Sequence, residues 1–340
     1  MKHSIRYLSE WELDGKILLA FPHKDTDWAE ILPEAIEQYC TMVKSFVMNE
    51  EELMIIGPDT EWIKEQLDGI DYSNIEFIVV PTNDTWTRDY GPITVVRHDR
   101  IRTLDFGFNG WGLKFAADKD NLVNLNLELS RRTPVGMYRN CREFILEGGS
   151  IETDGEGALL TTSKCLLSPN RNGGGTKHEI GERLSRELGV DHILWLDYGA
   201  LMGDDTDSHI DTLCRMAPGN TILFTGCKNV DDPQFEELLH MRAQLSMFKN
   251  AEGNPYNLIE LPMPDAVYDD EGNRLPATYA NYLVTKKALY MPTYAQPDND
   301  RLACNTVRIA FPDHNIVPVD CRTLIKQHGS LHCSTMMVPF

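Results

Sequence analysis

The stretch FILEGGSIETDGEGALLTT, from Phe144 to Thr162, contains the pattern that decides the fold. Two apolar runs of strand length flank a polar segment, whose Asp154-Gly155 pair is a typical hairpin turn. The stretch therefore predicts a β-hairpin. Glu147 ends the first run beside two glycines, where a carboxylate loses its water and a bare backbone lets another group or a ligand approach. The alternative is a strand-ending glutamate next to a β-bulge.

Similar apolar runs recur along the chain, each of strand length and most of them closed by Pro, Gly or a polar cluster. They begin at Ile17, Glu52, Ile75, His192, Thr221 and Ala288. Apolar residues at helical spacing lie between some of them, in the ranges 34–47, 179–188 and 233–248. The sequence therefore predicts an α/β protein. No linker or break in composition divides the chain, so residues 1–340 are expected to form a single domain.

Composition restricts the class of function. The chain has 340 residues and a formal net charge of −20, which disfavours nucleic acid as a partner and attracts small cations. No apolar run is long enough for a membrane span, and the first residues lack the apolar core of a secretory signal. Eight cysteines without a C-x-x-C pair indicate free thiols rather than a disulfide framework. A cytoplasmic protein is expected.

Four polar loops follow strand-like runs and contain the candidate functional residues. They are NDTWTRDYGP (83–92), LEGGSIETDGEG (146–157), GDDTDSHIDTLCR (203–215) and GSLHC (329–333). Their spacing is too irregular for a solenoid. It fits equivalent corners of a pseudosymmetric ring that meet at one centre.

Each loop alone also has a structural interpretation. The first is typical of an Asx-capped turn with a local pair between Arg88 and Asp89, and Arg215 stands at a helix-like end of the third. The third loop offers oxygen and nitrogen ligands, so a metal-dependent hydrolase is a rival hypothesis. It lacks the glycine and glutamate spacing of calcium loops and the second histidine of H-E-x-x-H zinc enzymes.

Together the loops supply a nucleophile, a base and paired carboxylates. A nucleophilic Cys333 needs a base and an orienting carboxylate, and His209 and Glu147 offer these roles. Asp89 and Asp211 remain, and two carboxylates that face one cavity repel each other unless a cation lies between them. A planar guanidinium satisfies both at once. The residues point to a guanidine substrate, and a non-catalytic guanidine-binding protein would have no use for Cys333 with His209.

These four loops, with DFGFNGWG from Asp105, resemble the signature blocks of the agmatine deiminases. That family is grouped with the Porphyromonas-type peptidylarginine deiminases in the pentein superfamily of guanidine-modifying enzymes, and the resemblance covers essentially the whole chain. It implies a five-bladed pseudosymmetric α/β propeller with the active site in the central channel. It also implies an enzyme that needs no metal and no organic cofactor.

The resemblance implies a role for each matching residue. Cys333 would be the nucleophile, His209 the general acid and base, and Glu147 the residue that holds and charges His209. Asp89 and Asp211 would grip the guanidinium. The reaction would convert agmatine and water to N-carbamoylputrescine and ammonia through a covalent thiouronium, in putrescine biosynthesis. Deiminases of peptidylarginine or free arginine, and amidinotransferases, remain open within the superfamily.

Residues 327–337 depart from the pattern of that family. The chain reads QHGSLHC where relatives commonly carry three glycines before Asn-Ile-His-Cys, and Met336-Met337 stand where a Gln-Gln often follows. The nucleophile itself matches, so the departures concern loop closure and the far end of the substrate.

The far end of the substrate has several candidate partners. Asp204, Asp205 and Asp207 could receive the amine of agmatine, and Trp86 and Trp111 are candidates to stack on the guanidinium or its stem. Free arginine would instead need a cation for its carboxylate, and no loop has an obvious spare one. The expected partner is a small cationic guanidine, and a homo-oligomer is compatible with the sequence.

Overall fold

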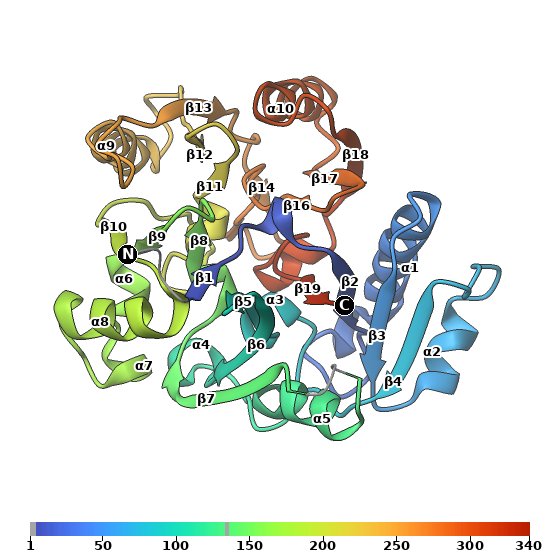
Figure 1. Cartoon of the computed structure of the whole chain (residues 1–340). Helices are drawn as coiled ribbons and strands as arrows, with labels where there is room; N and C mark the ends of the chain where they lie inside the picture. Colours follow the sequence, from blue (N-terminus) through green and yellow to red (C-terminus); the bar gives the residue numbers. More distant parts are fainter. Residues whose placement is uncertain (1–4, 133–135) are drawn as a thin grey trace.

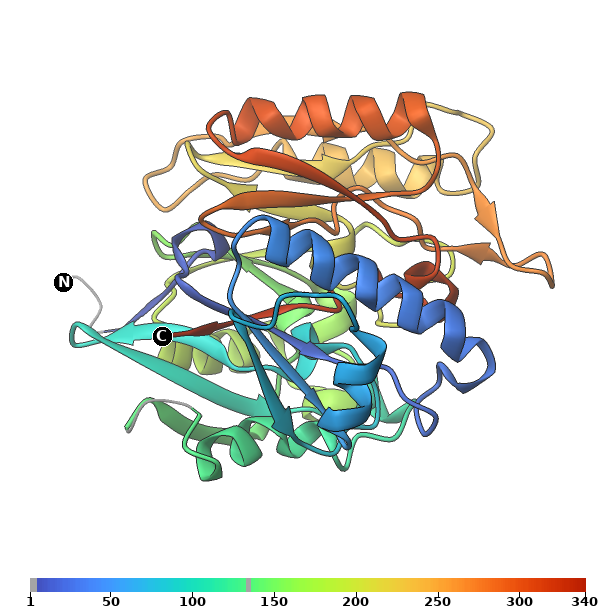
Figure 2. The same ribbon diagram turned by 90° about the vertical axis from the view of Figure 1, so that its right-hand side faces the viewer.

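The computed structural model describes residues 5–132 and 136–340. Helices lie at the outside of the molecule and short strands nearer its middle (Figure 1). A view from the side shows α1 (Leu32–Met48) and α10 (Pro297–Ala310) across the outer surface (Figure 2). The predicted α/β class is confirmed.

Five sheets share one strand pattern, in which an antiparallel pair is extended by a parallel strand. The sheets are β19-β2-β3-β4, β1-β5-β6-β7, β8-β9-β10, β11-β12-β13 and β16-β17-β18, and β14-β15 is a separate hairpin. Because each parallel strand needs a crossover, a helix leads into most of them. The faint repeat among the loops is thus visible in the strand topology.

The first two sheets contain the two ends of the described chain. Their strands are β2 (Gly15–Ala20), β3 (Leu53–Gly57), β4 (Ile75–Val79) and β19 (Met336–Pro339), then β1 (Ile5–Tyr7), β5 (Ile93–Arg97), β6 (Arg100–Gly107) and β7 (Tyr138–Ile145). β19 pairs antiparallel with β2, with Met336 opposite Leu18. The last strand therefore completes the first sheet, and Cys333 lies just before it.

The other sheets follow in chain order. Their strands are β8 (Ile151–Thr153), β9 (Ala158–Thr162), β10 (His192–Leu196), β11 (Cys214–Ala217), β12 (Thr221–Thr225), β13 (Asn257–Leu261), β16 (Leu283–Val284), β17 (Ala288–Thr293) and β18 (Asn315–Asp320); the separate hairpin is β14 (Val267–Tyr268) with β15 (Arg274–Leu275). The predicted hairpin is confirmed, because β8 and β9 pair antiparallel with Thr153 opposite Leu159.

The predicted helices and apolar runs are confirmed with small shifts at their ends. The other helices of more than four residues are α2 (Thr60–Gln66), α5 (Val123–Leu129), α8 (Lys177–Leu188) and α9 (Phe235–Leu245). α8 begins after a capping box of Thr176 with Glu179 and ends at Gly189, whose φ of 73° suits a glycine. α1 buries the side chains that recur three and four residues apart, which are Ala35, Gln38, Tyr39, Met42, Val43 and Phe46.

A polar connection leads from the outer strand of each sheet to the first strand of the next. The connections run from β4 to β5, β7 to β8, β10 to β11, β13 to β16 and β18 to β19. The four predicted loops occupy four of these five positions. The fifth connection, between β13 and β16, had no such signal in the sequence.

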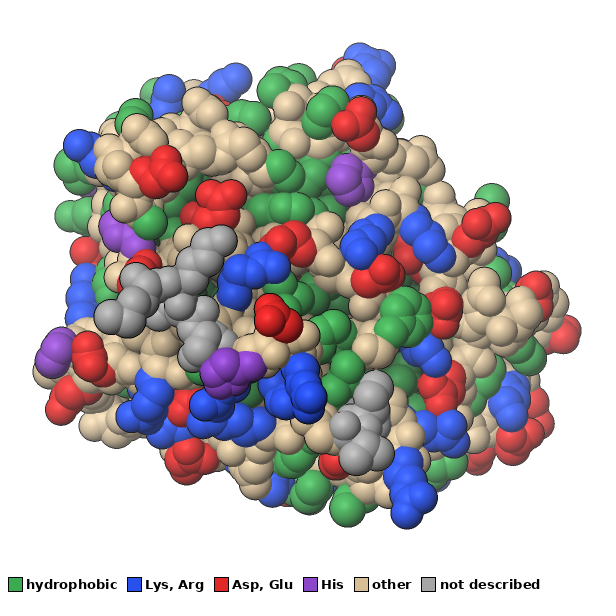
Figure 3. Space-filling model, viewed as in Figure 1, with side chains coloured by type: hydrophobic (Ala, Val, Ile, Leu, Met, Phe, Trp, Pro, Cys, Tyr) green, Lys and Arg blue, Asp and Glu red, His purple; other side chains and the backbone are tan. Residues whose placement is uncertain are grey.

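Two properties of the surface bear on possible partners. On the face drawn in Figure 3, basic side chains are interspersed with acidic ones, so the net negative charge does not form one acidic field there. No helix in the described part of the chain is long and apolar enough to cross a bilayer.

Candidate active site

The five connections contact one another in a closed cycle. The Gly149 backbone N–H donates to Asp89 Oδ1 (3.0 Å), His209 Nε2 lies 3.3 Å from Glu147 Oε2, and Asn281 Nδ2 donates to the Asp211 carbonyl (3.4 Å). The amide of Asn281 also donates to Cys333 Sγ (3.2 Å), and the Arg88 N–H donates to the Cys333 carbonyl (3.1 Å). The five connections thus bring their polar side chains to one place. All of the catalytic residues suggested by the sequence lie there.

The Cys333 thiol lies where these connections meet, and Cys333 is only 5% exposed. Its Sγ lies 3.7 Å from Asp211 Oδ2. Asn281 positions the surrounding turn, since its Oδ1 accepts hydrogen bonds from the N–H groups of His332 (2.9 Å) and Cys333 (3.3 Å). Burial raises the pKa of the Cys333 thiol well above its usual range, and the charges of Asp211 and Asp89 raise it further. Without a cation nearby, this cysteine is a neutral thiol.

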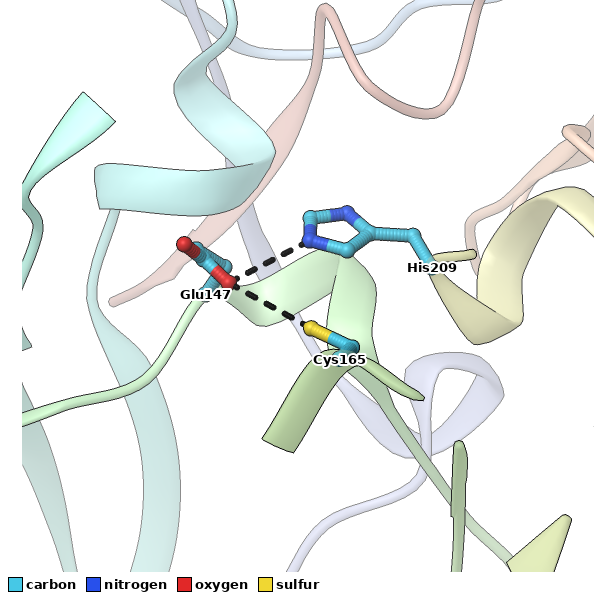
Figure 4. Close-up of side chains that lie close together, drawn as sticks. All are labelled: Glu147, Cys165 and His209. Atoms are coloured by element: carbon cyan, nitrogen blue, oxygen red, sulfur yellow. Dashed lines mark hydrogen bonds and ion pairs between the residues drawn. The ribbon is translucent and has the colours of Figure 1, made fainter. Parts of the chain in front are cut away.

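His209 lies between two carboxylates and is fully buried. Its Nε2 lies 3.3 Å from Glu147 Oε2, as Figure 4 shows, and its Nδ1 lies 3.5 Å from Asp89 Oδ1. Burial lowers the pKa of His209, but the charge of Asp89 and the hydrogen bond to Glu147 raise it, and the net direction is well above its usual value. His209 is therefore an imidazolium when the cavity holds no cation.

Arg171 was not predicted as a site residue, although it holds Glu147. Its side chain is fully buried, and its Nε donates to both Glu147 oxygens, at 3.0 and 2.8 Å. Its two other nitrogens donate to Asp207 Oδ2 (2.6 Å) and to the Thr206 carbonyl (2.8 Å). Burial raises the pKa of Glu147, but His209 and Arg171 lower it, and the net direction is below its usual value. Glu147 is thus a carboxylate at neutral pH.

Asp89 and Asp211 face the same small space from different connections. Trp111 Nε1 donates to Asp89 Oδ2 (2.9 Å), and the His332 ring lies 2.7 Å from Asp211 Oδ2 through Nδ1. A Cβ on Gly149 would lie 2.7 Å from Asp89 Oδ1, 2.8 Å from His209 Nδ1 and 3.0 Å from Asp211 Oδ2. The close approach expected at the glycine pair is confirmed.

Two buried polar atoms in this space have no hydrogen-bond partner among the described residues. They are His209 Nδ1 and Asp211 Oδ1. Buried polar atoms are nearly always paired in native proteins, so an orphaned pair at one place indicates a ligand or water that completes it. A donor with several N–H groups would satisfy Asp211 Oδ1.

His209 and Asp211 are two positions apart, so in an extended segment their side chains would share one face. In the structure His209 instead precedes a 3₁₀ turn (Ile210–Thr212), and Asp207 and Ser208 before it have φ of 67° and 64°. Both are in the left-handed region, which is strained for residues other than glycine. Arg171 on Asp207 helps to hold this turn.

The predicted interpretations of Arg88 and Arg215 were wrong. Arg88 Nη2 pairs with Glu10 Oε1 (2.7 Å) rather than with Asp89. Arg215 lies on β11, not at a helix end, and its guanidinium pairs with Glu10 (2.9 Å) and Glu152. Both arginines are therefore paired with glutamates, and neither is free to bind a substrate carboxylate.

A cavity with an empty volume of about 380 Å³ opens in front of Cys333. Its wall includes Trp86 and Trp111 and the carboxylates Asp27, Asp84, Asp89 and Asp205. Among the described residues that line it, none is a lysine or an arginine. Gly329 is needed at its rim, because a Cβ there would lie 2.3 Å from the Trp86 ring.

Asp84 and Asp89 are buried in the wall of this cavity and Asp205 is partly buried, whereas Asp27 is exposed. Burial raises the pKa of Asp89 to about 6, with His209 opposing, and raises that of Asp84 to about 7. Burial also raises the pKa of Asp205. A cation placed among these groups would keep them ionised.

The three aspartates suggested for the far end of the substrate differ in their surroundings. Asp205 lines the cavity. Asp207 is paired with Arg171 (2.6 Å) and with Lys114 (2.8 Å). Asp204 accepts hydrogen bonds from Thr206 and from the Ser208 N–H (2.7 Å). Of these three aspartates, Asp205 alone lines the cavity.

Known proteins resemble the chain over nearly its whole length. A Legionella pneumophila protein provisionally named agmatine deiminase is 30% identical over 97% of this chain and 94% of its own. The solved structure of a Cys→Ser variant of C. jejuni agmatine deiminase with substrate bound is 38% identical, covers 98% of this chain and 96% of its own, and superposes with a TM-score of 0.89.

A third relative has a different provisional name. A Porphyromonas gingivalis structure provisionally named arginine deiminase is 40% identical, covers 98% of both chains and has a TM-score of 0.92. Relatives of this chain are thus named after different guanidine compounds, agmatine in some and arginine in others. Because residues 6–339 match its sequence pattern, the chain belongs to the Porphyromonas-type peptidyl-arginine deiminase family.

Proposed function

We propose that the protein is an agmatine deiminase, which hydrolyses agmatine to N-carbamoylputrescine and ammonia. One observation carries the proposal. A buried cysteine stands beside two carboxylates and a His–Glu pair, at the end of a cavity whose described lining holds four carboxylates and no lysine or arginine. Such a cavity suits a dication, and agmatine carries a guanidinium at one end and an ammonium at the other.

The guanidinium would lie between Asp89 and Asp211. Its N–H groups would donate to Asp211 Oδ1, which otherwise has no partner among the described residues, and to Asp89 Oδ1. Its carbon would then lie between Cys333 Sγ and His209 Nδ1. The ammonium would lie toward Asp205, with the aliphatic stem between Trp86 and Trp111. Charge-assisted pairing at both ends fixes the substrate, which supplies much of the rate through orientation.

The first half of the reaction would break a C–N bond. The positive charge of the guanidinium favours the Cys333 thiolate, and the thiol proton passes to solvent as the substrate binds. The thiolate attacks the guanidinium carbon, and His209 Nδ1 gives its proton to the departing nitrogen, which leaves as ammonia. A covalent S-alkylthiouronium remains. Glu147 and Arg171 keep His209 oriented, and its charge is stabilised by the Glu147 carboxylate.

The second half of the reaction would break the C–S bond. Water enters where ammonia left, His209 Nδ1 accepts its proton, and the oxygen attacks the same carbon. The Cys333 thiolate leaves, the proton of the new hydroxyl passes to solvent, and the carbon becomes the ureido group of the product. None of these steps uses a metal or an organic cofactor.

We also propose that the five sheets are the blades of a pseudosymmetric propeller in one domain, with this site in its central channel. The common strand pattern and the closed cycle of contacts between the connections support this arrangement. The eight cysteines are free thiols, which suits a reducing compartment such as the cytosol and putrescine synthesis there.

Free or peptidyl arginine is the alternative substrate, and the names of relatives include it. Its carboxylate, or the polypeptide chain in its place, would face Asp84 and Asp205, and none of the described residues that line the cavity is a lysine or an arginine that would pair with a carboxylate. We therefore expect arginine to be rejected.

The test compares release of ammonia and ureido product from agmatine, free arginine and an arginine peptide. Agmatine should give equal amounts of both products, with a kcat/KM at least about 100-fold above those of the arginine substrates. A higher kcat/KM for the arginine peptide would reassign the substrate. Product that forms only after an amine acceptor is added would indicate an amidinotransferase instead.

The reactivity of Cys333 in the substrate-free protein should reflect its raised pKa. Alkylation by iodoacetamide, followed at the Cys333 peptide by mass spectrometry, should rise with pH without a plateau through pH 9, since only the thiolate reacts. Asp211→Asn removes a negative charge that raises this pKa, so it should shift the rise to lower pH. A plateau near pH 7 in the unaltered protein would show a preformed thiolate and contradict this account.

A further inference from the structure

Cys165 is a buried thiol that the deimination steps do not use. It lies on α6 (Ser163–Leu166) and is fully buried, with its Sγ 3.6 Å from Glu147 Oε2. The same oxygen lies 3.3 Å from His209 Nε2. Figure 4 shows the three side chains directed toward one another from three different segments.

We propose that Glu147, Cys165 and His209 form a binding site for a thiophilic divalent cation such as Zn²⁺, and that the bound ion inhibits the enzyme. The inhibition rests on the proposed function, because it acts through His209 and Glu147. The binding itself does not depend on it.

The spacing of the ligand atoms fits a tetrahedral ion. All three atoms lie within 4.8 Å of one another. Zinc bonds of about 2.0–2.1 Å to nitrogen, 2.0–2.2 Å to oxygen and 2.3 Å to sulfur place nitrogen and oxygen roughly 3.3–3.5 Å apart, and sulfur and oxygen roughly 3.5–3.7 Å apart. The separations of 3.3 and 3.6 Å in the structure match both edges. The site could therefore form with little movement.

The chemistry of the donor set selects the kind of ion. A thiolate with an imidazole favours Zn²⁺ or Co²⁺ over Mg²⁺ and Ca²⁺, which prefer oxygen ligands alone. Three protein ligands leave a fourth position for water. Arg171 donates to both Glu147 oxygens, which is the outer support typical of a carboxylate that ligates a metal.

Binding would leave the buried charge unchanged. The S–H bond of Cys165 and the Nε2–H bond of the imidazolium break as the S–metal and N–metal bonds form, and both protons pass to solvent. One dication thus replaces two protons, with no change in oxidation state. Because the total positive charge at the site is the same before and after binding, Arg171 repels the bound ion no more than it repelled the two protons.

The ion would reach the site through the substrate cavity. Cys165 and His209 are fully buried, and the four carboxylates of the cavity attract cations. Once bound, the ion would hold the His209 ring and draw Glu147 into its coordination. The ring could then no longer alternate freely between acid and base. Deimination would stop although Cys333 is untouched.

Titration of the purified protein with Co²⁺ tests the site without any turnover. A Co²⁺–thiolate charge-transfer band in the near ultraviolet, saturating at one ion per chain, is expected in the unaltered protein and in Cys333→Ser. It should be lost in Cys165→Ser, whose hydroxyl keeps the hydrogen bond to Glu147 but is a far poorer ligand. A band lost in Cys333→Ser and kept in Cys165→Ser would overturn the proposal, as would no band at all.

Inhibition by Zn²⁺ gives the second readout. Cys165→Ser should keep most of its turnover of agmatine, while the Zn²⁺ concentration for half-inhibition rises by about 10–100-fold. Equal sensitivity of the two proteins would contradict the assignment to Cys165. If no agmatine is turned over at all, the proposed function fails while the Co²⁺ result still decides the binding site.

Discussion

Replacing Cys333 with serine should abolish the release of ammonia from agmatine and leave the protein folded. The hydroxyl is close in size to the thiol and can keep the contacts with Asn281 (3.2 Å) and Asp211 (3.7 Å). It is a far weaker nucleophile, because a cation can lower a thiol pKa into a useful range but not that of an alcohol. We expect kcat to fall by about 10⁴-fold or more.

Three measurements separate a chemical defect from a folding defect. Ammonia release gives the loss of turnover, calorimetry with agmatine should still show binding, and thermal unfolding should match the unaltered protein. Cys321→Ser is the matched control, since Cys321 is also buried and its Sγ already donates to the Val319 carbonyl. Turnover of Cys333→Ser within about tenfold of that control would remove Cys333 from the role of nucleophile.

Replacing Arg171 with methionine should cost both stability and rate. Arg171 is fully buried and contacts Glu147, Asp207 and the Thr206 carbonyl. Its removal leaves Glu147 with His209 as its remaining positive neighbour, and breaking a buried pair of this kind costs about 3–5 kcal/mol. The strained turn before His209 also loses a support. We expect kcat to fall by about 10–100-fold, as for other residues that orient a functional group.

The pKa of Glu147 determines the direction in which stability and kcat should change with pH. The folded-state pKa of Glu147 lies below its ordinary value. Its ionisation therefore contributes stability above the unfolded-state pKa, and this is lost as pH falls through the folded-state value. Without Arg171 the pKa of Glu147 rises, so the acid-side loss of stability and of kcat should move to higher pH.

Urea unfolding and kcat profiles from pH 3 to 8 measure both effects, because the folded-state pKa of Glu147 lies below 4.5. Arg171→Lys, which keeps the charge but not the fork of donors, should lie between the two proteins. Arg322→Met removes a surface arginine paired with Asp320, so it should cost less than about 1 kcal/mol. An Arg171→Met protein as stable as this control, with an unmoved acid limb, would contradict the role assigned to Arg171.

Sequence patterns predicted the elements of the fold and four of its five connections. Short apolar runs located the strands and helical spacing located the long helices, because each of these signals lies within one segment. Asp89, Glu147, His209, Asp211 and Cys333 were found because acidic, glycine-rich loops are distinctive. The arrangement of the sheets brings these residues together in space, and the repeat in the sequence only suggested this arrangement.

Asn281 and Arg171 were missed because their function arises from contacts across sheets. Asn281 lies in a mostly apolar segment, and its partner Cys333 is 52 positions away along the chain. Arg171 lies on the short helix α7 (Pro169–Asn172), 24 positions from Glu147. The repeat held one signal that could have found Asn281. Four of the five connections between sheets carry a polar loop, so the fifth connection, which contains Asn281 and leads into β16, was the place to look for another polar residue.

The pairing of β19 with β2 has a consequence for the protein while it is being made. β2 and β3 leave the ribosome early, but the open edge of β2 has no partner until β19 has been synthesised. An exposed strand edge is prone to pair with other chains, so this is the period of greatest aggregation risk. Cys333, the proposed nucleophile, lies in the turn that leads into β19. When β19 pairs with β2, the nascent chain covers this strand edge and places the Cys333 thiol in the site in the same step. The onset of agmatine turnover in an in vitro translation reaction would therefore report when this sheet is completed.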